Sequence, residues 1–239
     1  MKFRTLFVTG TDTGVGKTTV LSAIAAALSL QGRKVGVFKP AETGCNLGPD
    51  GRRLPADAIQ LKYFSGCQVD LDTICPFRLH EPLAPLVAAR REGVSIDSEQ
   101  LVRTHAIIAA AHDITFVEGA GGLLVPITSG ATFADLAAFL DALIVVVVAS
   151  RLGAINHALL TLRHAQSVGL RVLGYVVNFL TAEPDVAART NVEVLREWYG
   201  PPLGVVPFVE AVTMSDECRQ RLADTAEAHV RLLDLLVPC

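Results

Sequence analysis

The residues with the clearest chemistry form a glycine-rich loop near the start of the chain. Thr9–Thr19, TGTDTGVGKTT, follows the apolar run Leu6–Val8 and precedes an alanine-rich segment. Small residues let successive backbone N–H groups surround a phosphate, and a following helix directs its positive end to the same point. The pattern therefore predicts a strand, a phosphate-binding loop and a helix, in which Lys17 contacts terminal phosphates and Thr18 holds magnesium.

This loop departs from the GxxxxGK[ST] pattern at its first glycine, because Thr11 occupies that position and Gly10 stands one residue earlier. A glycine-rich turn also serves any sharp connection between a strand and a helix. A GKT ending directly after a strand is much rarer by chance. We therefore prefer phosphate binding to a purely structural turn.

Two further charged residues come directly after predicted strands. Lys39 follows Lys34–Phe38, and Glu118 follows the apolar run Ile114–Val117. Ligands of open parallel sheets sit beyond the carboxyl ends of the strands, so Lys39 is expected on the same edge as the phosphate loop. Walker-type nucleotidases place an acidic residue at such a strand end, where it binds magnesium directly or through water. Glu118 is the candidate for that role.

Two other features have open interpretations. Asp57 lies in the first turn of a predicted helix, where aspartate is commonly a dipole partner but can also supply a magnesium ligand. The segment Ser150–His157, SRLGAINH, opens another helix, and its free N–H groups beside Arg151 offer a second anion site. Every helix has such an end, so an ordinary cap explains this segment equally well.

Asn178 and a proline-punctuated segment also allow a structural and a functional interpretation. Asn178 ends the predicted strand Val172–Val177, where its amide either reads the edge of a base or caps a turn. Pro76–Pro85, PFRLHEPLAP, is either a rigid connection or one wall of a substrate pocket.

The elements that must position these residues alternate regularly between strands and helices. Strands are predicted at Leu6–Val8, Lys34–Phe38, Ile114–Val117, Ala142–Ala149, Val172–Val177 and Leu203–Val206. Helices are predicted at Thr18–Gln31, Ala56–Phe64, Leu86–Arg91, Ser98–His112, from Ser150–His157 to about Val168, at Asp185–Tyr199 and along the tail Asp216–Leu236, with an exposed loop at Asn46–Arg53. This order predicts a single α/β domain over residues 1–239, with a doubly wound, mostly parallel sheet covered by helices on both faces.

Composition excludes several classes of function. The 239 residues are 51% hydrophobic with a formal net charge of −3, and the 21 basic residues are scattered, which argues against nucleic-acid binding. The most apolar run, Ala142–Ala149, is shorter than the roughly twenty residues that span a bilayer, so no membrane association is expected. The N-terminus MKFRTLF lacks the apolar core of a signal peptide, and the five cysteines form no CxxC pair. We expect a cytoplasmic protein.

The segments TGTDTGVGKT, KPAETG, EPLAP, VEGAGG, RLGAINH and VVN, in this order and spacing, closely resemble the dethiobiotin synthetase family. The resemblance extends from Phe7 to about Pro207 and implies a homodimer of subunits with the P-loop NTPase fold. It implies ATP and magnesium as cofactors, and 7,8-diaminopelargonic acid and carbon dioxide as substrates. The reaction closes a cyclic urea in biotin synthesis, through a carbamate and a carbamic-phosphoric anhydride.

The resemblance also implies roles for individual residues. Lys17, Lys39 and Thr13 would be catalytic, and Thr18, Asp57 and Glu118 would surround magnesium. The nucleotide would contact Gly14, Val15, Gly16, Lys17, Thr18, Thr19, Asn178 and Pro207. The substrate would contact Thr13, Lys39, Thr43 and Glu118, and its carboxylate would reach Gly153, Ala154, Ile155 and Asn156 across the dimer interface.

Some positions depart from the family pattern, and two other functions remain open. Gly14 stands where other members can carry an acidic residue, and Ala84 and Leu86 stand where serine and histidine are often found. One alternative is a P-loop ATPase of the partitioning or cobyrinate-synthase kind, against which Lys39 and the RLGAINH segment argue. The other is a nucleotide-sensing module without turnover, which could lose Lys39 or Glu118.

Overall fold

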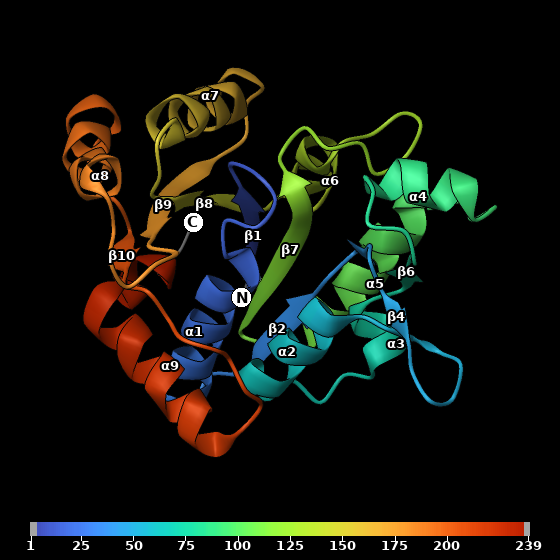
Figure 1. Ribbon diagram of the computed structural model, residues 1–239. Coiled ribbons are helices and arrows are strands. Elements are labelled where there is room, and N and C mark those ends of the chain that lie inside the picture. Colours follow the sequence, from blue (N-terminus) through green and yellow to red (C-terminus); the bar gives the residue numbers. More distant parts are fainter. Residues whose placement is uncertain (1–3, 237–239) are drawn as a thin grey trace.

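The computed structural model describes residues 4–236, and its centre is a sheet of six strands in the order β10-β9-β8-β1-β7-β2 (Figure 1). Every neighbouring pair in this sheet is parallel. The strands are β1 (Arg4–Gly10), β2 (Val35–Phe38), β7 (Ile114–Gly122), β8 (Leu143–Ala149), β9 (Val172–Asn178) and β10 (Gly204–Val206). The predicted parallel sheet is confirmed.

Helices cover both faces of this sheet (Figure 1). One face packs against α1 (Lys17–Leu30), α2 (Ala56–Ser65), α3 (Leu71–Ile74) and α9 (Asp216–His229). The other face packs against α4 (Pro85–Arg91), α5 (Ser98–Ala110), α6 (Phe133–Phe139), α7 (Ala154–Ser167) and α8 (Val186–Tyr199). Figure 1 shows α9 lying beside α1 on the first of these faces.

The apolar patterns of the strands follow from this double cover. All seven residues of β8, LIVVVVA, are buried, as expected for a parallel strand with helices on both sides. In β1, Leu6 and Val8 belong to the core beneath α1, whereas Phe7 belongs to the core on the opposite face. Alternate side chains of a strand point to opposite faces, so a continuous apolar run supplies both cores.

Four short strands and two short helices, α3 and α6, were absent from the sequence prediction. The segment predicted as an exposed loop, Asn46–Arg53, contains an antiparallel pair, β4 (Asn46–Leu47) with β5 (Arg53–Leu54). A parallel pair, β3 (Ala41–Glu42) with β6 (Phe77–Arg78), forms beside the main sheet. The two-residue strands are too short for a periodic pattern, and α3 and α6 are only four and seven residues long.

The predicted helix over Asp216–Leu236 is interrupted in the structure. Helix α9 ends at His229, and Val230 forms an antiparallel bridge with Gly204 at the edge of the sheet. A 3₁₀ turn, η1 (Leu232–Leu235), follows. Backbone pairing with the edge strand interrupts the helix here, because the N–H of Arg231 donates to the carbonyl of Leu203 at 2.8 Å.

No helix in the described part of the chain combines the length and the apolar character needed to cross a bilayer.

Candidate functional site

A cavity of about 780 Å³ opens at the carboxyl ends of β1, β2 and β7. Of the residues predicted to bind nucleotide, metal or substrate, ten line it: Thr13, Gly14, Gly16, Lys17, Thr18, Thr19, Lys39, Thr43, Asp57 and Glu118. Strand β1 lies between β8 and β7, which places its phosphate loop near the middle of the sheet edge. Residues distant in sequence therefore meet in one cavity.

The phosphate loop is closely packed where α1 begins. Gly16 has a φ of 87°, and a Cβ at this position would lie 2.1 Å from Nδ2 of Asn178. Glycine is required here for both the backbone conformation and the space. Lys17, the first residue of α1, is only 7% exposed, and its ammonium donates to the carbonyl of Asp12 at 3.3 Å. Burial lowers the pKa of Lys17, against the opposing effect of Glu118.

Lys39 lies between two carboxylates. Its Nζ donates to Oδ2 of Asp57 at 2.8 Å and to Oε1 of Glu118 at 2.5 Å. Burial alone would lower the pKa of Lys39, but Glu118 and Asp57 outweigh this effect and raise the pKa above its ordinary value. Lys39 is therefore a fixed positive charge at the base of the cavity. In return, Lys39 lowers the pKa of Asp57 although burial opposes it.

Glu118 and Thr18 form an oxygen-rich corner beside Lys39. The hydroxyl of Thr18 donates to Oε1 of Glu118 at 2.9 Å, and the Glu118 side chain is fully buried. Its second oxygen, Oε2, has no hydrogen-bond partner within the described residues. An unpaired buried carboxylate oxygen is costly and is a suitable ligand for a hard cation.

The carboxylates of this corner do not form a complete metal cage. Within residues 4–236, no group of three or more His, Cys, Asp or Glu side chains is arranged to hold a metal ion. Magnesium in nucleotide sites is typically bound by one or two carboxylates together with phosphate oxygens and water. The residues present fit that form of binding.

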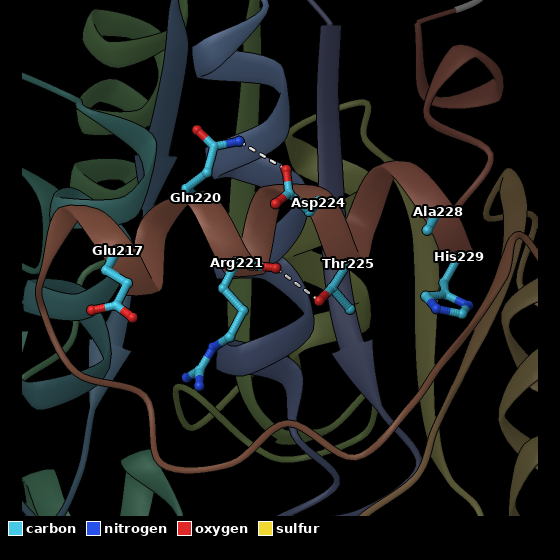
Figure 2. A pocket seen from close by; sticks show the side chains of 7 residues that line it. All are labelled: Glu217, Gln220, Arg221, Asp224, Thr225, Ala228 and His229. Atoms are coloured by element: carbon cyan, nitrogen blue, oxygen red, sulfur yellow. Dashed lines mark hydrogen bonds between the residues drawn. The ribbon is translucent and has the colours of Figure 1, made fainter.

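A second hollow lies on the outer face of α9, away from the cavity (Figure 2). It is lined by Glu217, Gln220, Arg221, Asp224, Thr225, Ala228 and His229. Figure 2 shows hydrogen bonds of Gln220 to Asp224 and of Thr225 to the carbonyl of Arg221, all within the helix. None of the predicted site residues lines this hollow.

Comparison with known proteins identifies the family. A family model described as an AAA domain matches residues 4–215. The ATP-dependent dethiobiotin synthetase BioD of Thermodesulfovibrio yellowstonii is 41% identical over 212 residues, which cover 85% of this chain and 88% of that protein. The enzyme of the same name from Bacillus subtilis strain 168 is 38% identical, covering 88% and 90%. The chain belongs to the dethiobiotin synthetase family.

Solved structures with lower identity share the fold. The MinC:MinD cell division complex of Aquifex aeolicus matches with a TM-score of 0.55 and 20% identity over 99% of this chain and 98% of that one. Cobyrinic acid a,c-diamide synthase from Mycobacterium smegmatis, solved with ADP and magnesium, matches with a TM-score of 0.54 and 20% identity over 92% of each chain. These likenesses show the fold alone. The 41% identity to a dethiobiotin synthetase favours that family over the partitioning and cobyrinate-synthase alternative.

Some residues implied by the dethiobiotin synthetase resemblance do not line the cavity. Asn178 is buried at the end of β9, and its Nδ2 donates to the carbonyl of Val15 at 3.0 Å, so it supports the phosphate loop from behind. Pro207 directly follows β10. Neither these residues nor Val15 are among those that line the cavity.

The segment implied to bind the substrate carboxylate also lies outside the lining of its own chain's cavity. Gly153, with a φ of 89°, precedes α7, and no side chain caps the helix. Ala154, Ile155 and Asn156 form the first turn of α7. The neighbouring Leu152 is 85% exposed.

Sequence reasoning did not identify two buried residues that hold the start of α2 and the turn before α7. Glu42, at the end of β3, lines the cavity, and its carboxylate accepts the N–H groups of Asp57 and Ala58. Burial, together with Asp57, raises the pKa of Glu42 to about 7 although Lys39 opposes it. Asn191 of α8 donates to the carbonyl of Arg151 at 2.9 Å and so fastens the turn before α7. The only sequence signal for either residue was the position of Glu42, three residues after Lys39. Nothing in the sequence pointed to Asn191.

Proposed function

We propose that the protein is an ATP- and magnesium-dependent ligase that closes the ureido ring of dethiobiotin from 7,8-diaminopelargonic acid and carbon dioxide. One observation carries the proposal: Lys17 of the phosphate loop shares a cavity with Lys39, which lies between Asp57 and Glu118. Membership of the dethiobiotin synthetase family supplies the substrate class.

Magnesium would be held by Thr18, Asp57 and Glu118 together with nucleotide phosphates. The unpartnered Oε2 of Glu118 and the hydroxyl of Thr18 support this assignment. When bound, the ion neutralises negative charge on the phosphates. The protein contributes two carboxylates that are already oriented by Lys39, of which Glu118 is fully buried and Asp57 is partly exposed.

The reaction needs positioned positive charge more than it needs a proton-transfer residue. One amine attacks carbon dioxide to form a carbamate, and a carbamate oxygen attacks the γ-phosphate of ATP, with ADP as leaving group. The second amine then attacks the carbamic-phosphoric anhydride, displaces phosphate and closes the ring. Lys39 would stabilise the carbamate and Lys17 the transferred phosphoryl group, while Thr13 and Thr43 orient the reacting atoms.

The substrate carboxylate and the base would be bound at the margins of the cavity. The backbone N–H groups of Gly153 to Asn156 would receive the carboxylate from the cavity of the partner subunit in a homodimer. This geometry is supported by the position of the segment outside its own cavity and by the exposed Leu152 beside it. Asn178 and Pro207, at the ends of β9 and β10, would contact the base.

We also place the protein in the cytoplasm. Cys45, Cys67, Cys75 and Cys218 are buried free thiols, which suits a reducing compartment.

The deciding experiment measures ADP release and formation of the cyclic urea with diaminopelargonate, bicarbonate, ATP and magnesium. We expect both products in equal amounts. Folded protein that binds ATP but forms no cyclic urea would overturn the proposed activity and leave a nucleotide-sensing module as the better interpretation.

A further inference from the structure

Helix α2 begins without a cap of its own. Its N-cap residue is Pro55, which has no side-chain hydrogen-bonding group. The first turn of a helix has N–H groups without partners inside the helix, and these need an acceptor when they are buried. Here the acceptor comes from another element: Oε1 of Glu42 accepts the N–H of Asp57 at 2.9 Å, and Oε2 accepts the N–H of Ala58 at 3.0 Å.

The Glu42 carboxylate is itself held firmly. Glu42 is only 6% exposed, and its strand β3 pairs with β6, with the carbonyl of Glu42 accepting the N–H of Leu79 at 2.8 Å. Both carboxylate oxygens are engaged by α2, so the side chain has little freedom to turn. A negative charge at the N-terminus of a helix is also favoured by the helix dipole.

Asp57, by contrast, is held mainly through its backbone. Its side chain is 43% exposed, and its carboxylate pairs with Lys39, whose Nζ donates to Oδ2 at 2.8 Å. The direction of this carboxylate therefore depends on where the first turn of α2 lies. From these contacts we infer that Glu42 is a positioning residue, which fixes the start of α2 and thereby holds Asp57 at the cation site.

This inference rests on the cation site of the proposed function, but it does not require turnover. Groups that orient metal ligands typically contribute 10- to 100-fold to metal affinity. In Glu42→Gln one carboxylate oxygen becomes an NH₂ group, so one N–H of α2 faces a donor. The side chain keeps its size, and the phosphate loop keeps all of its own contacts.

The experiment compares ADP binding to the full-length protein with and without magnesium, by calorimetry. In the wild type, magnesium is expected to tighten ADP binding. In Glu42→Gln this enhancement should fall about tenfold, with metal-free ADP affinity changed less than about twofold. Asp97→Asn is the matched control, because Asp97 caps α5 away from the cavity. It should leave both affinities unchanged.

A double-mutant cycle tests whether Glu42 acts through Asp57. In an Asp57→Asn background, adding Glu42→Gln should change the magnesium enhancement by less than about twofold, because coupled residues are not additive. A full additional loss would overturn the inference. So would an unchanged enhancement in Glu42→Gln, or an equal loss of metal-free ADP binding.

Hydrogen exchange provides a readout that needs no variant. The amide hydrogens of Asp57 and Ala58 should be protected in the wild type, because Glu42 accepts both. Rapid exchange at both positions would contradict the inference even if Glu42→Gln failed to fold. Absence of cyclic urea in the wild type would overturn the proposed ligase activity instead, and the ADP measurements would still decide the role of Glu42.

Discussion

The Lys39 side chain is buried and forms two ion pairs, so its ammonium group is surrounded by protein atoms and not by water. Its side chain is 3% exposed and contacts Asp57 and Glu118. An ammonium fixed in this way needs no reorganisation when negative charge develops on a carbamate. Lys17, on the phosphate loop, forms no ion pair of this kind with the residues that the structure describes, and its ammonium donates to the carbonyl of Asp12 at 3.3 Å.

Lys39→Ala should therefore reduce turnover far more than nucleotide binding. Loss of one preorganised charge-stabilising group typically lowers kcat about 10²- to 10³-fold, while ATP affinity should change only a few-fold. Steady-state kinetics and ATP calorimetry at saturating magnesium, on protein checked for folding, would measure both. Equal losses of kcat and ATP affinity would contradict a role of Lys39 in the transition state.

His105 predicts how stability depends on pH. It is 7% exposed, its Nε2 lies 3.0 Å from the Thr5 hydroxyl, and burial lowers its pKa from 6.5 to about 4. Between these values the unfolded chain binds the proton more tightly, so stability falls as pH drops from 6.5 to 4. The full difference between the two pKa values corresponds to about 3 kcal/mol in the free energy of unfolding. His105→Gln should show a smaller loss of Tm from pH 7 to 5.

The exposed His229 offers the control, since His229→Gln should leave this pH profile unchanged. A wild-type profile that His105→Gln does not flatten would show that other groups dominate the acid sensitivity.

At the scale of elements, sequence reasoning found the residues that follow strands and missed those that support them. Lys39 and Glu118 were predicted because strand ends can be recognised from apolar runs. Glu42 was missed because its importance depends on the start of α2, which folds against it from 15 residues further along the chain. Asn191 was missed for the same reason, because it lies 40 residues from the turn that it fastens.

The proline segment shows how a loop becomes a rigid wall. Pro82, Leu83, Ala84 and Pro85 line the cavity. The N–H groups of His80 and Glu81 donate to Oε1 of Glu92, at 2.7 and 3.3 Å, and Arg53 pairs with the same carboxylate. The segment Pro76–Pro85 can therefore be both a rigid connection and a wall of the cavity.

Glu92→Ala should loosen this wall. Removing an acceptor of several hydrogen bonds should lower the free energy of unfolding by about 1–3 kcal/mol and raise the KM for diaminopelargonate, with the KM for ATP little changed. Chemical denaturation and kinetics would measure the two effects. Arg91→Ala is the control: it removes only the exposed pair with Glu81 and should have little effect. An unchanged KM for diaminopelargonate in Glu92→Ala would show that this wall does not contribute to substrate binding.

For the whole molecule, the order of the strands explains how the site is assembled. The sheet order places β1 between β7 and β8, so the phosphate loop has Glu118 on one side and the turn before α7 on the other. The α/β class was predictable from alternation of elements. The neighbours of β1 were not, because they depend on which buried strands pair across the sheet.

The proposed dimer makes a prediction about Leu152, which is 85% exposed beside α7. Leu152→Asp should place a charge in the subunit interface, shift the protein towards monomer and raise the KM for diaminopelargonate. Leu233→Asp changes a residue that is 77% exposed in η1 and should do neither. Sedimentation would measure the oligomeric state. A wild-type monomer with full activity would contradict the proposed dimer.

The bridge between Val230 and Gly204 has a consequence for aggregation. Strand β10 is an outer strand of the sheet, and the chain beyond α9 occupies its free backbone groups. Unpaired sheet edges recruit strands from other molecules. Truncation after His229 should therefore increase light scattering, whereas Leu235→Ala, which loses a buried side chain but keeps the bridge, should lower only Tm. The segment that follows α9 would then prevent strands of other molecules from pairing with β10.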